Sequence, residues 1–196
     1  MRTQPLAKLW ASILLRLISL PRARLDLGDI QALRVATATL DVVVSGLVLN
    51  FVPQPDRAVT EMARMARPGG TVAAYVWDYA EGMPLWRYFW DVAGALDLKA
   101  KEMDEGRRFS LCKPEPLYRL FLTAGLEGVR VRAIEVPTYF RDFDDYWSPF
   151  LGGQGPAPSY AMSLSEQRRV ELRDQIQAKL PGDSYGGIPS ALAYGP

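Results

Sequence analysis

The sequence predicts an α/β fold with central parallel strands, an antiparallel C-terminal edge and flanking helices. Two runs, DVVVS at 41–45 and TVAAYVW at 71–77, are almost continuously apolar, as strands buried on both faces are. Between them, apolar side chains from Ala58 to Met65 recur at helical spacing, so the unit is strand, helix, strand. Its crossover is long enough to join parallel neighbours. Alternation of apolar and polar residues over 129–136 indicates a further strand with one wet face, near a sheet edge.

The composition is that of one globular domain: 196 residues, 48% apolar and 23% charged. A net charge of +1 creates no field that would attract nucleic acid, so we expect no nucleic-acid partner. Cys112 is the only cysteine, which excludes an internal disulfide and fits a cytoplasmic location. The chain has no histidine, which removes serine-histidine and cysteine-histidine catalysis. Any proton transfer must use a carboxylate, Tyr, Lys or water.

Residues 1–22 predict a basic amphipathic helix. Arginines and a lysine without any acid surround the apolar stretch LWASILLRLISL. Apolar side chains fall at spacings of three and four, at Leu6, Leu9, Ile13, Leu17 and Leu20. A helix that lays one face on a core is the main interpretation, with a signal peptide or a membrane-surface helix as alternatives. The stretch is too short to span a bilayer stably. A short strand is predicted next, over 23–27.

Three more helices are predicted by an apolar stripe, a proline in the first turn or a capping pair. They run from Pro84 to Leu96, from Pro116 to Gly125, and from the capping-box pair Ser163 and Glu166 to Leu180. Pro68-Gly69-Gly70 is expected to end the helix before the second strand, and Pro137 to limit the edge strand. The glycine-rich and proline-rich tail, 181–196, is predicted to be irregular, with at most a very short strand at 191–194.

Two clusters invite a functional interpretation that we do not favour. Asp142, Asp144 and Asp145 resemble a metal-binding group, but acids at a helix start are far commoner than a metal site without histidine. The glycines over 152–155 resemble a phosphate loop only in number, because Pro-Ala-Pro follows them instead of Lys-Ser or Lys-Thr at a helix start. We therefore expect a helix cap at the first cluster and a plain loop at the second.

Four stretches, in this order and spacing, resemble a class I S-adenosylmethionine-dependent methyltransferase of the small-molecule, type 11 kind. They are GDIQAL at 28–33, LDVVVSGLVLNFV at 40–52, EMARMARPGGTV at 61–72, and FLTAGL at 121–126 before VRV at 129–131. The resemblance covers about residues 24–150, and more loosely to 180. It implies a Rossmann-like sheet, S-adenosylmethionine as cofactor and a small-molecule methyl acceptor. A nicotinamide-dependent oxidoreductase is a weaker alternative, since Pro-Gly-Gly before a strand favours the methyltransferase pattern.

The resemblance assigns cofactor-binding residues to two places. Asp29 matches the acid that bonds the adenine amino group, with the backbone of Ile30 beside it; the alternative is a turn residue after Gly28. Ser45 and Gly46, at the end of the first apolar strand, match the loop under the methionine part of the cofactor. For Ser45, a helix cap or turn is the alternative. Leu47 and Asn50 would line the same side of the cofactor pocket as Ser45 and Gly46.

A substrate pocket is predicted at or after strand ends. Its candidate residues are Tyr75, Trp77, Asp78, Tyr139 and Trp147. The aromatic residues have core or cap packing as the alternative. Asp78 is the only candidate base, and no catalytic residue is assigned, because methyl transfer can rest on proximity and alignment.

One departure from the family pattern is large. Nothing in residues 1–28 supplies the glycine-rich turn, which the family needs because the backbone must approach the cofactor closely. We therefore expect an N-terminally truncated or degenerate methyltransferase with an incomplete sheet, divided into the helix 1–22, a partial domain 23–180 and the tail. Unpaired sheet edges would invite self-association. The alternative function is a non-catalytic methyltransferase remnant that serves as an interaction module or has no independent function.

Overall fold

The computed structural model describes residues 26–152, 154–181 and 188–195. These residues form one sheet of four strands in the order β1-β2-β4-β3. The strands are β1 (Leu40–Gly46), β2 (Ala66–Trp77), β3 (Ile134–Phe140) and β4 (Ile188–Gly195). β1 and β2 are parallel, and β4 is antiparallel to both β2 and β3. The structure thus confirms the predicted α/β arrangement of parallel strands with an antiparallel C-terminal part.

Eight α-helices and three short 3-10 helices are assigned among the described residues. The α-helices are α2 (Pro55–Met65), α3 (Pro84–Leu96), α4 (Ala100–Met103), α5 (Glu105–Arg108), α6 (Pro114–Thr123), α7 (Phe143–Trp147), α8 (Pro156–Ser163) and α9 (Glu166–Lys179). The 3-10 helices are η1 (Leu49–Phe51), η2 (Ser110–Cys112) and η3 (Ser148–Leu151).

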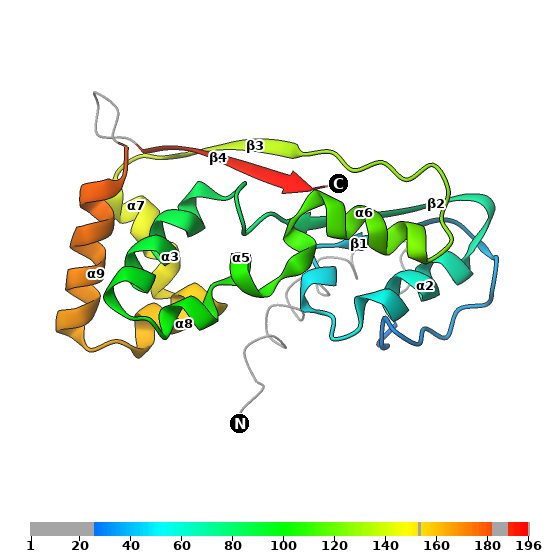
Figure 1. The fold of residues 1–196 in the computed structure, drawn as a ribbon, viewed down its shortest axis with the longest axis horizontal. Coiled ribbons are helices and arrows are strands. Elements are labelled where there is room, and N and C mark those ends of the chain that lie inside the picture. The colour runs from blue at the N-terminus through cyan, green and yellow to red at the C-terminus, as the bar shows by residue number, and fades with distance from the viewer. Residues whose placement is uncertain (1–25, 153, 182–187, 196) are drawn as a thin grey trace.

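The elements gather into two lobes (Figure 1). The sheet lobe contains β1, β2, α2 and α6, and the helical lobe contains α3, α7, η3, α8 and α9. The strands β3 and β4 form a long antiparallel ribbon that runs along both lobes. Among the described residues, this ribbon joins the rest of the sheet through two residue pairs, Val76 with Gly195 and Trp77 with Tyr194.

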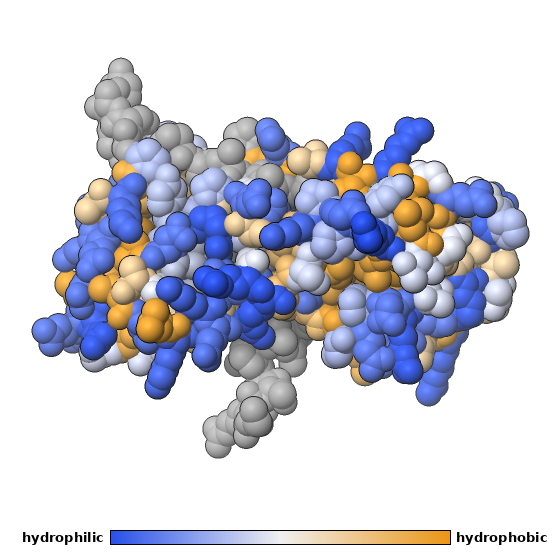
Figure 2. All heavy atoms as spheres, viewed as in Figure 1, coloured by the Kyte–Doolittle hydropathy of each residue, from blue (hydrophilic) through white to orange (hydrophobic). Residues whose placement is uncertain are grey.

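The sheet lobe is covered on one face. α2 and α6 pack on that face, where Val59 and Phe121 meet Val76 in one buried cluster. On the opposite face, Val42 and Val44 are 57% and 59% exposed. Figure 2 shows apolar side chains at the surface around α6 as well. Because β1 stands at one end of the strand order, its outer edge has no neighbouring strand among the described residues.

The helical lobe is closed around an aromatic core. The rings of Phe89 and Phe150 stack with their centroids 4.6 Å apart, and both side chains are fully buried. Tyr146 is also fully buried and donates its hydroxyl proton to the carbonyl oxygen of Leu85 at 2.9 Å. The carboxylate of Asp142 accepts a hydrogen bond from the backbone N–H of Asp145 at 2.8 Å, which confirms the expected helix cap at the start of α7.

The edge strand lies further along the chain than predicted. It spans Ile134–Phe140 instead of 129–136, and it continues through Pro137. Strand assignment requires a partner, and β4 pairs with β3 only from Ile134 onward. Proline is tolerated there because β3 is an edge strand, where a missing N–H can face solvent.

The expected irregular tail is wrong in part, because β4 occupies eight of its residues, Ile188–Gly195.

The helix α9 is capped by Ser165, whose hydroxyl accepts from the Arg168 N–H at 3.3 Å, and not by the predicted Ser163. β2 also begins earlier than expected and runs through Pro68, Gly69 and Gly70. Gly69 has a φ of 76°, and the pairing of β1 with β2 shifts register at that end, so the Pro-Gly-Gly stretch is an irregular part of the strand.

The predicted helix over 1–22 lies outside the described residues. Of the predicted strand at 23–27, only 26 and 27 are described, and they are not in a strand. Within the described ranges, no helix has the length and apolar character to cross a membrane.

Candidate functional site

The carboxyl ends of β1 and β2 lie side by side and form the candidate site. Gly46 and Tyr75 are paired residues of the two parallel strands. The chain then turns at Leu47, whose N–H donates to the carbonyl oxygen of Tyr75 at 2.8 Å. Leu47 has a φ of 57°, a left-handed conformation that is uncommon for a non-glycine residue and occurs often at functional sites. In open α/β sheets, ligands bind beyond the carboxyl ends of the strands.

Gly46 allows Tyr75 to lie across the end of β1. A Cβ atom at position 46 would stand 2.4 Å from the hydroxyl oxygen of Tyr75, which is far inside van der Waals contact. Any other residue at this position would displace the tyrosine side chain. The glycine and the aromatic residue predicted for the site are therefore in direct contact.

Two buried polar atoms at this end of β1 have no hydrogen-bond partner among the described residues. They are Ser45 Oγ and Asn50 Oδ1, on residues that are only 5% and 9% exposed. The amide nitrogen of Asn50 does have partners, the carbonyl oxygen of Trp77 at 3.2 Å and the sulfur of Cys112 at 3.8 Å. A buried polar group without a partner costs about 1–3 kcal/mol. Such atoms are expected where a bound group supplies the missing partner.

The turn that contains Asp29 lies at the same end of the sheet. The Asp29 carboxylate accepts from the backbone N–H of Gln31 at 2.9 Å, and the Gln31 side chain accepts from the N–H of Gln54, just before α2, at 3.0 Å. Ile30 packs against the sheet-lobe core beside η1. Asp29 is exposed, so its carboxylate both shapes the turn and remains open to a ligand. The structure thus brings the two predicted groups of cofactor-binding residues to one end of the sheet.

An ion pair on α2 holds the segment that follows this turn. Arg64 donates to the carbonyl oxygens of Leu33 at 3.2 Å and Val35 at 2.8 Å, and it pairs with Glu61 at 2.8 Å. Glu61 in turn accepts from the Leu33 N–H at 3.1 Å. The hydrogen bond with Arg64 lowers the pKa of Glu61 and raises that of Arg64. Sequence reasoning missed this role, although opposite charges three residues apart on a helix were a usable signal.

The predicted substrate residues are only partly brought together. Tyr75, Trp77 and Asp78 lie at the carboxyl end of β2, and Asp78 Oδ1 accepts from the N–H groups of Ala80 and Glu81 at 3.1 and 2.9 Å. Tyr139 lies on the exposed ribbon. Tyr194 of β4 pairs with Trp77, the last residue of β2, on one side and with Ile134 of β3 on the other. Ile134 is therefore level with the end of β2, and Tyr139, which is exposed, lies five residues further along the ribbon.

Trp147 is placed elsewhere. It is 5% exposed and packs in the core of the helical lobe against Phe89 and Phe150. The structure therefore places Trp147 away from the candidate site. Its surroundings match the alternative interpretation, which was packing in the core.

A buried carboxylate lies next to the exit of β2 and was not predicted. Glu105 accepts from the indole N–H groups of Trp86 at 3.3 Å and Trp90 at 2.5 Å, and burial raises its pKa. The neighbouring Asp104 forms a close ion pair with Arg87. A Cβ atom at Gly106 would lie 2.5 Å from the carbonyl oxygen of Tyr79, so this segment presses directly on the chain leaving β2. No local sequence pattern marks a glutamate held by two tryptophans from another helix.

Cys112 is buried at the same place. Burial raises the pKa of its thiol to about 11, which keeps it protonated at neutral pH. In the described ranges, no group of three Cys, Asp or Glu side chains is arranged to hold a metal ion.

Comparison with known proteins gives a family for part of the chain. The family model described as a methyltransferase domain matches residues 12–74, which include β1, α2 and most of β2. No curated protein sequence matches the chain.

Several solved structures resemble the chain. A protein named as a methyltransferase of an antibiotic biosynthesis pathway from Anabaena variabilis has a TM-score of 0.50 at 15% identity, over 89% of this chain and 73% of that one. A protein named as a methyltransferase from Bacillus halodurans gives 0.48 at 15% identity, over 86% and 67%. A SAM-dependent methyltransferase from Thermotoga maritima gives 0.40 at 22% identity, over 59% and 49%. The chain thus spans about half to three quarters of these relatives, and the Anabaena structure shares its fold.

Proposed function

We propose that this chain is a class I S-adenosylmethionine-dependent methyltransferase and that it transfers a methyl group from S-adenosylmethionine to a small molecule, at the carboxyl ends of β1 and β2. The observation that carries the proposal is the pair of buried atoms, Ser45 Oγ and Asn50 Oδ1, without a partner in the described part of the chain. They lie where the sheet topology and the family pattern both direct a cofactor.

The residues at this end of the sheet fit the cofactor chemically. S-adenosylmethionine offers amino, carboxylate and hydroxyl groups; Ser45 Oγ can donate or accept, and Asn50 Oδ1 can accept. The turn at Gly46 and Leu47 would supply backbone groups beside them. Asp29 would hold the adenine amino group, because its exposed carboxylate is already oriented by the Gln31 N–H.

The chain's own contribution to the reaction would be position and environment. The bound cofactor supplies an electrophilic methyl group on a sulfonium sulfur. Tyr75 and Trp77 would hold the acceptor molecule at the end of β2, and alignment of this kind can supply most of the acceleration in such transfers. Asp78 is the candidate base, since two N–H groups at Oδ1 fix the orientation of its carboxylate.

Calorimetric titration of S-adenosylmethionine into the full chain tests the proposal. We expect micromolar binding, weakened roughly tenfold in Ser45→Ala because one hydrogen bond is lost. Without cofactor, Ser45→Ala should melt at the same temperature or higher, because an unpaired buried hydroxyl has been removed. Ser110→Ala, at an exposed serine on η2, is the matched control and should change neither measurement. Equal binding by the Ser45 variant would reject the assignment.

A second candidate function is a methyltransferase remnant without catalysis. The observation that favours it is the outer edge of β1, which has no neighbouring strand among the described residues, together with the exposed side chains of Val42 and Val44. The same titration distinguishes this remnant from an active enzyme. No binding at millimolar cofactor would favour the remnant, and micromolar binding would exclude it.

A further inference from the structure

The side chain of Tyr75 lies across the carboxyl end of β1, over the backbone of Gly46. The two residues are Cα partners in the parallel pairing of β1 with β2. A Cβ atom at position 46 would stand 2.4 Å from the hydroxyl oxygen of Tyr75, 2.7 Å from its Cζ and 3.3 Å from its Cε1. The phenol group therefore fills the space that a side chain at position 46 would need, and one wall of the candidate cofactor site is aromatic.

Tyr75 and Ser45 reach this strand end from opposite faces of the sheet. Ala74 and Val76 are buried on the side of α2 and α6, while Tyr75 between them is 42% exposed. Ser45 pairs with Ala74 and shares its buried side. The Tyr75 side chain makes no hydrogen bond or ring contact with another described residue. Its ring is therefore not part of the core of the sheet lobe.

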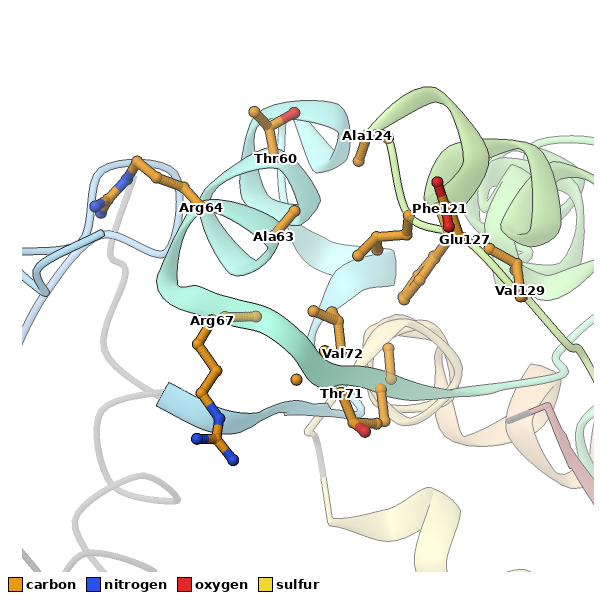
Figure 3. Close-up of a pocket in the computed structure, with 18 of the residues that line it drawn as sticks. Thr60, Ala63, Arg64, Arg67, Thr71, Val72, Phe121, Ala124, Glu127 and Val129 are labelled. Carbon is orange, nitrogen blue, oxygen red and sulfur yellow. The ribbon is translucent and has the colours of Figure 1, made fainter. Parts of the chain in front are cut away.

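The large cavity beside β2 is a separate feature (Figure 3). It has a volume of about 1140 Å³ and lies between residues 66–74 of β2 and the segment 124–131 that follows α6. Tyr75 comes directly after the last β2 residue that lines this cavity. The aromatic wall therefore belongs to the strand ends, where the candidate site lies, and not to the cavity.

The chemistry of the cofactor gives such a ring a role. S-adenosylmethionine carries a positive charge on the sulfur atom that holds the methyl group, and the face of a tyrosine ring attracts a cation within about 6 Å of its centroid. In the proposed function, on which this inference rests, Gly46 lies under the methionine part and Tyr75 borders the acceptor. Because the reacting atoms must come within about 3–3.5 Å of each other, a ring that borders the acceptor also lies near the sulfur.

We propose that Tyr75 determines the specificity of the site for a charged sulfur, by a cation–π contact with the sulfonium group of S-adenosylmethionine. The ring would lose this attraction after transfer, because the sulfur of the product, S-adenosylhomocysteine, keeps the electron pair of the broken C–S bond and carries no charge. Tyr75 thus favours binding of the methyl donor and release of the demethylated product.

Asp78 is a second group at this end of the sheet that could favour a cation. Its Oδ1 atom accepts from the N–H groups of Ala80 and Glu81 at 3.1 and 2.9 Å, and these two donors compensate part of the carboxylate charge. Asp78→Asn removes that charge and leaves the ring in place. We expect it to change the preference for S-adenosylmethionine over S-adenosylhomocysteine less than removal of the ring does.

Calorimetric titration of the two compounds, each into the full chain, tests the inference without an acceptor molecule. Tyr75→Leu should weaken S-adenosylmethionine by roughly threefold to tenfold and S-adenosylhomocysteine by less than about twofold, because only the first carries a charge. Tyr75→Phe keeps the aromatic face and should preserve the preference of the parent. Tyr118→Leu, at an exposed tyrosine on α6, is the matched control and should change neither affinity.

The outcomes separate this inference from the proposed function. No binding of either compound by the parent would overturn both. Micromolar binding with an equal loss of both compounds in Tyr75→Leu would overturn this inference alone, as would a preference that disappears in Asp78→Asn and persists in Tyr75→Leu. Tighter binding of both compounds by Tyr75→Leu would show that the ring obstructs the site, which also contradicts the inference.

Gly46→Ala supplies a second test, because the added Cβ atom displaces the ring. It should reduce the preference for S-adenosylmethionine in the parent but not in the Tyr75→Leu background, where no ring remains to be displaced. Comparing the two compounds removes any effect on the parts that they share. An equal change of the preference in both backgrounds would show that the preference does not depend on the position of the ring, and would overturn the proposal.

Discussion

The helical lobe and the sheet lobe differ in how completely each buries its apolar residues. In the helical lobe, Phe89, Tyr146 and Phe150 are fully enclosed by aromatic neighbours from several helices. In the sheet lobe, Val43 is buried under α2 while Val42 and Val44, its direct neighbours, face outward. Both sides of a parallel sheet are normally covered. The difference shows that the sheet lobe, which carries the candidate site, has a face and an edge suited to a further element.

The largest expected effect breaks the closed lobe. Phe150→Ala removes a fully buried ring that stacks on Phe89, and we expect the free energy of unfolding to fall by about 3–5 kcal/mol. Chemical denaturation measures it. Leu151→Ala, at the exposed neighbouring residue, should change it by less than about 0.5 kcal/mol. A loss below about 1 kcal/mol in the Phe150 variant would show that the core is loosely packed.

The next prediction concerns the junction of the lobes. Burial raises the pKa of Glu105 in the folded state above its ordinary value of 4.5, and the adjacent Asp104 adds to the rise. The folded state therefore loses stability as the pH rises above 4.5, because the unfolded chain releases this proton more readily. Glu105→Gln has no charge to bury, so its melting temperature should exceed that of the parent more at pH 8 than at pH 5.

Thermal melts at the two pH values provide the measurement, with Glu171→Gln on the exposed face of α9 as control. The indole groups of Trp86 and Trp90 still find an acceptor in the glutamine side chain. If the melting temperatures of Glu105→Gln and the parent protein differ by the same amount at both pH values, the assignment of a buried Glu105 with a raised pKa is contradicted.

A smaller, local effect is expected in the segment held by Arg64. Arg64→Ala removes the hydrogen bonds to the carbonyl oxygens of Leu33 and Val35, so amide exchange at residues 33–39 should become roughly tenfold faster. Arg64→Lys should leave amide exchange almost as fast as in Arg64→Ala, because a single ammonium group cannot make the forked set of hydrogen bonds that the guanidinium makes. Arg57→Ala, exposed on the same helix, serves as control. Unchanged exchange would mean that the segment is held by other contacts.

The smallest effect on stability is expected at the open face. Val44→Lys should change the free energy of unfolding by less than about 0.5 kcal/mol, because the side chain is already exposed. A lysine beside a free strand edge should also reduce self-association, as followed by sedimentation. Val43→Lys, one residue earlier and buried, is the contrasting variant and should be strongly destabilised. A large loss in the Val44 variant would show that the face is covered.

Local signals predicted the helices and the parallel strands well. Pro84 in a first turn and an apolar stripe to Leu96 match the bounds of α3, and the apolar run at 41–45 lies within β1. These patterns depend only on neighbours in the sequence. The family pattern named Asp29 and Ser45, and the bond from Gln54 to Gln31 holds the Asp29 turn near the carboxyl end of β1, where Ser45 lies; their contact with a cofactor stays a prediction.

Features that depend on distant partners were not predictable. β3 begins at Ile134 because β4 stops there, and nothing near 129–136 carries that information. The glycines and prolines of the tail concealed β4, whose strand conformation comes from pairing with β3. Trp147 follows a predicted strand, which suggested a place in the substrate pocket, whereas its ring is enclosed by helices from other parts of the chain.

The placement of β4 has a consequence for how the chain folds. Of the strands described, β4 is synthesised last, yet it lies between two strands that are made much earlier. Its pairing with β2 closes a loop longer than half the chain, which carries a large entropic cost and slows folding. Both lobes can form as the chain emerges, and the ribbon can join them only afterwards. The rate-limiting step should therefore be the late insertion of β4, leaving a long-lived intermediate in which two formed lobes are still unconnected.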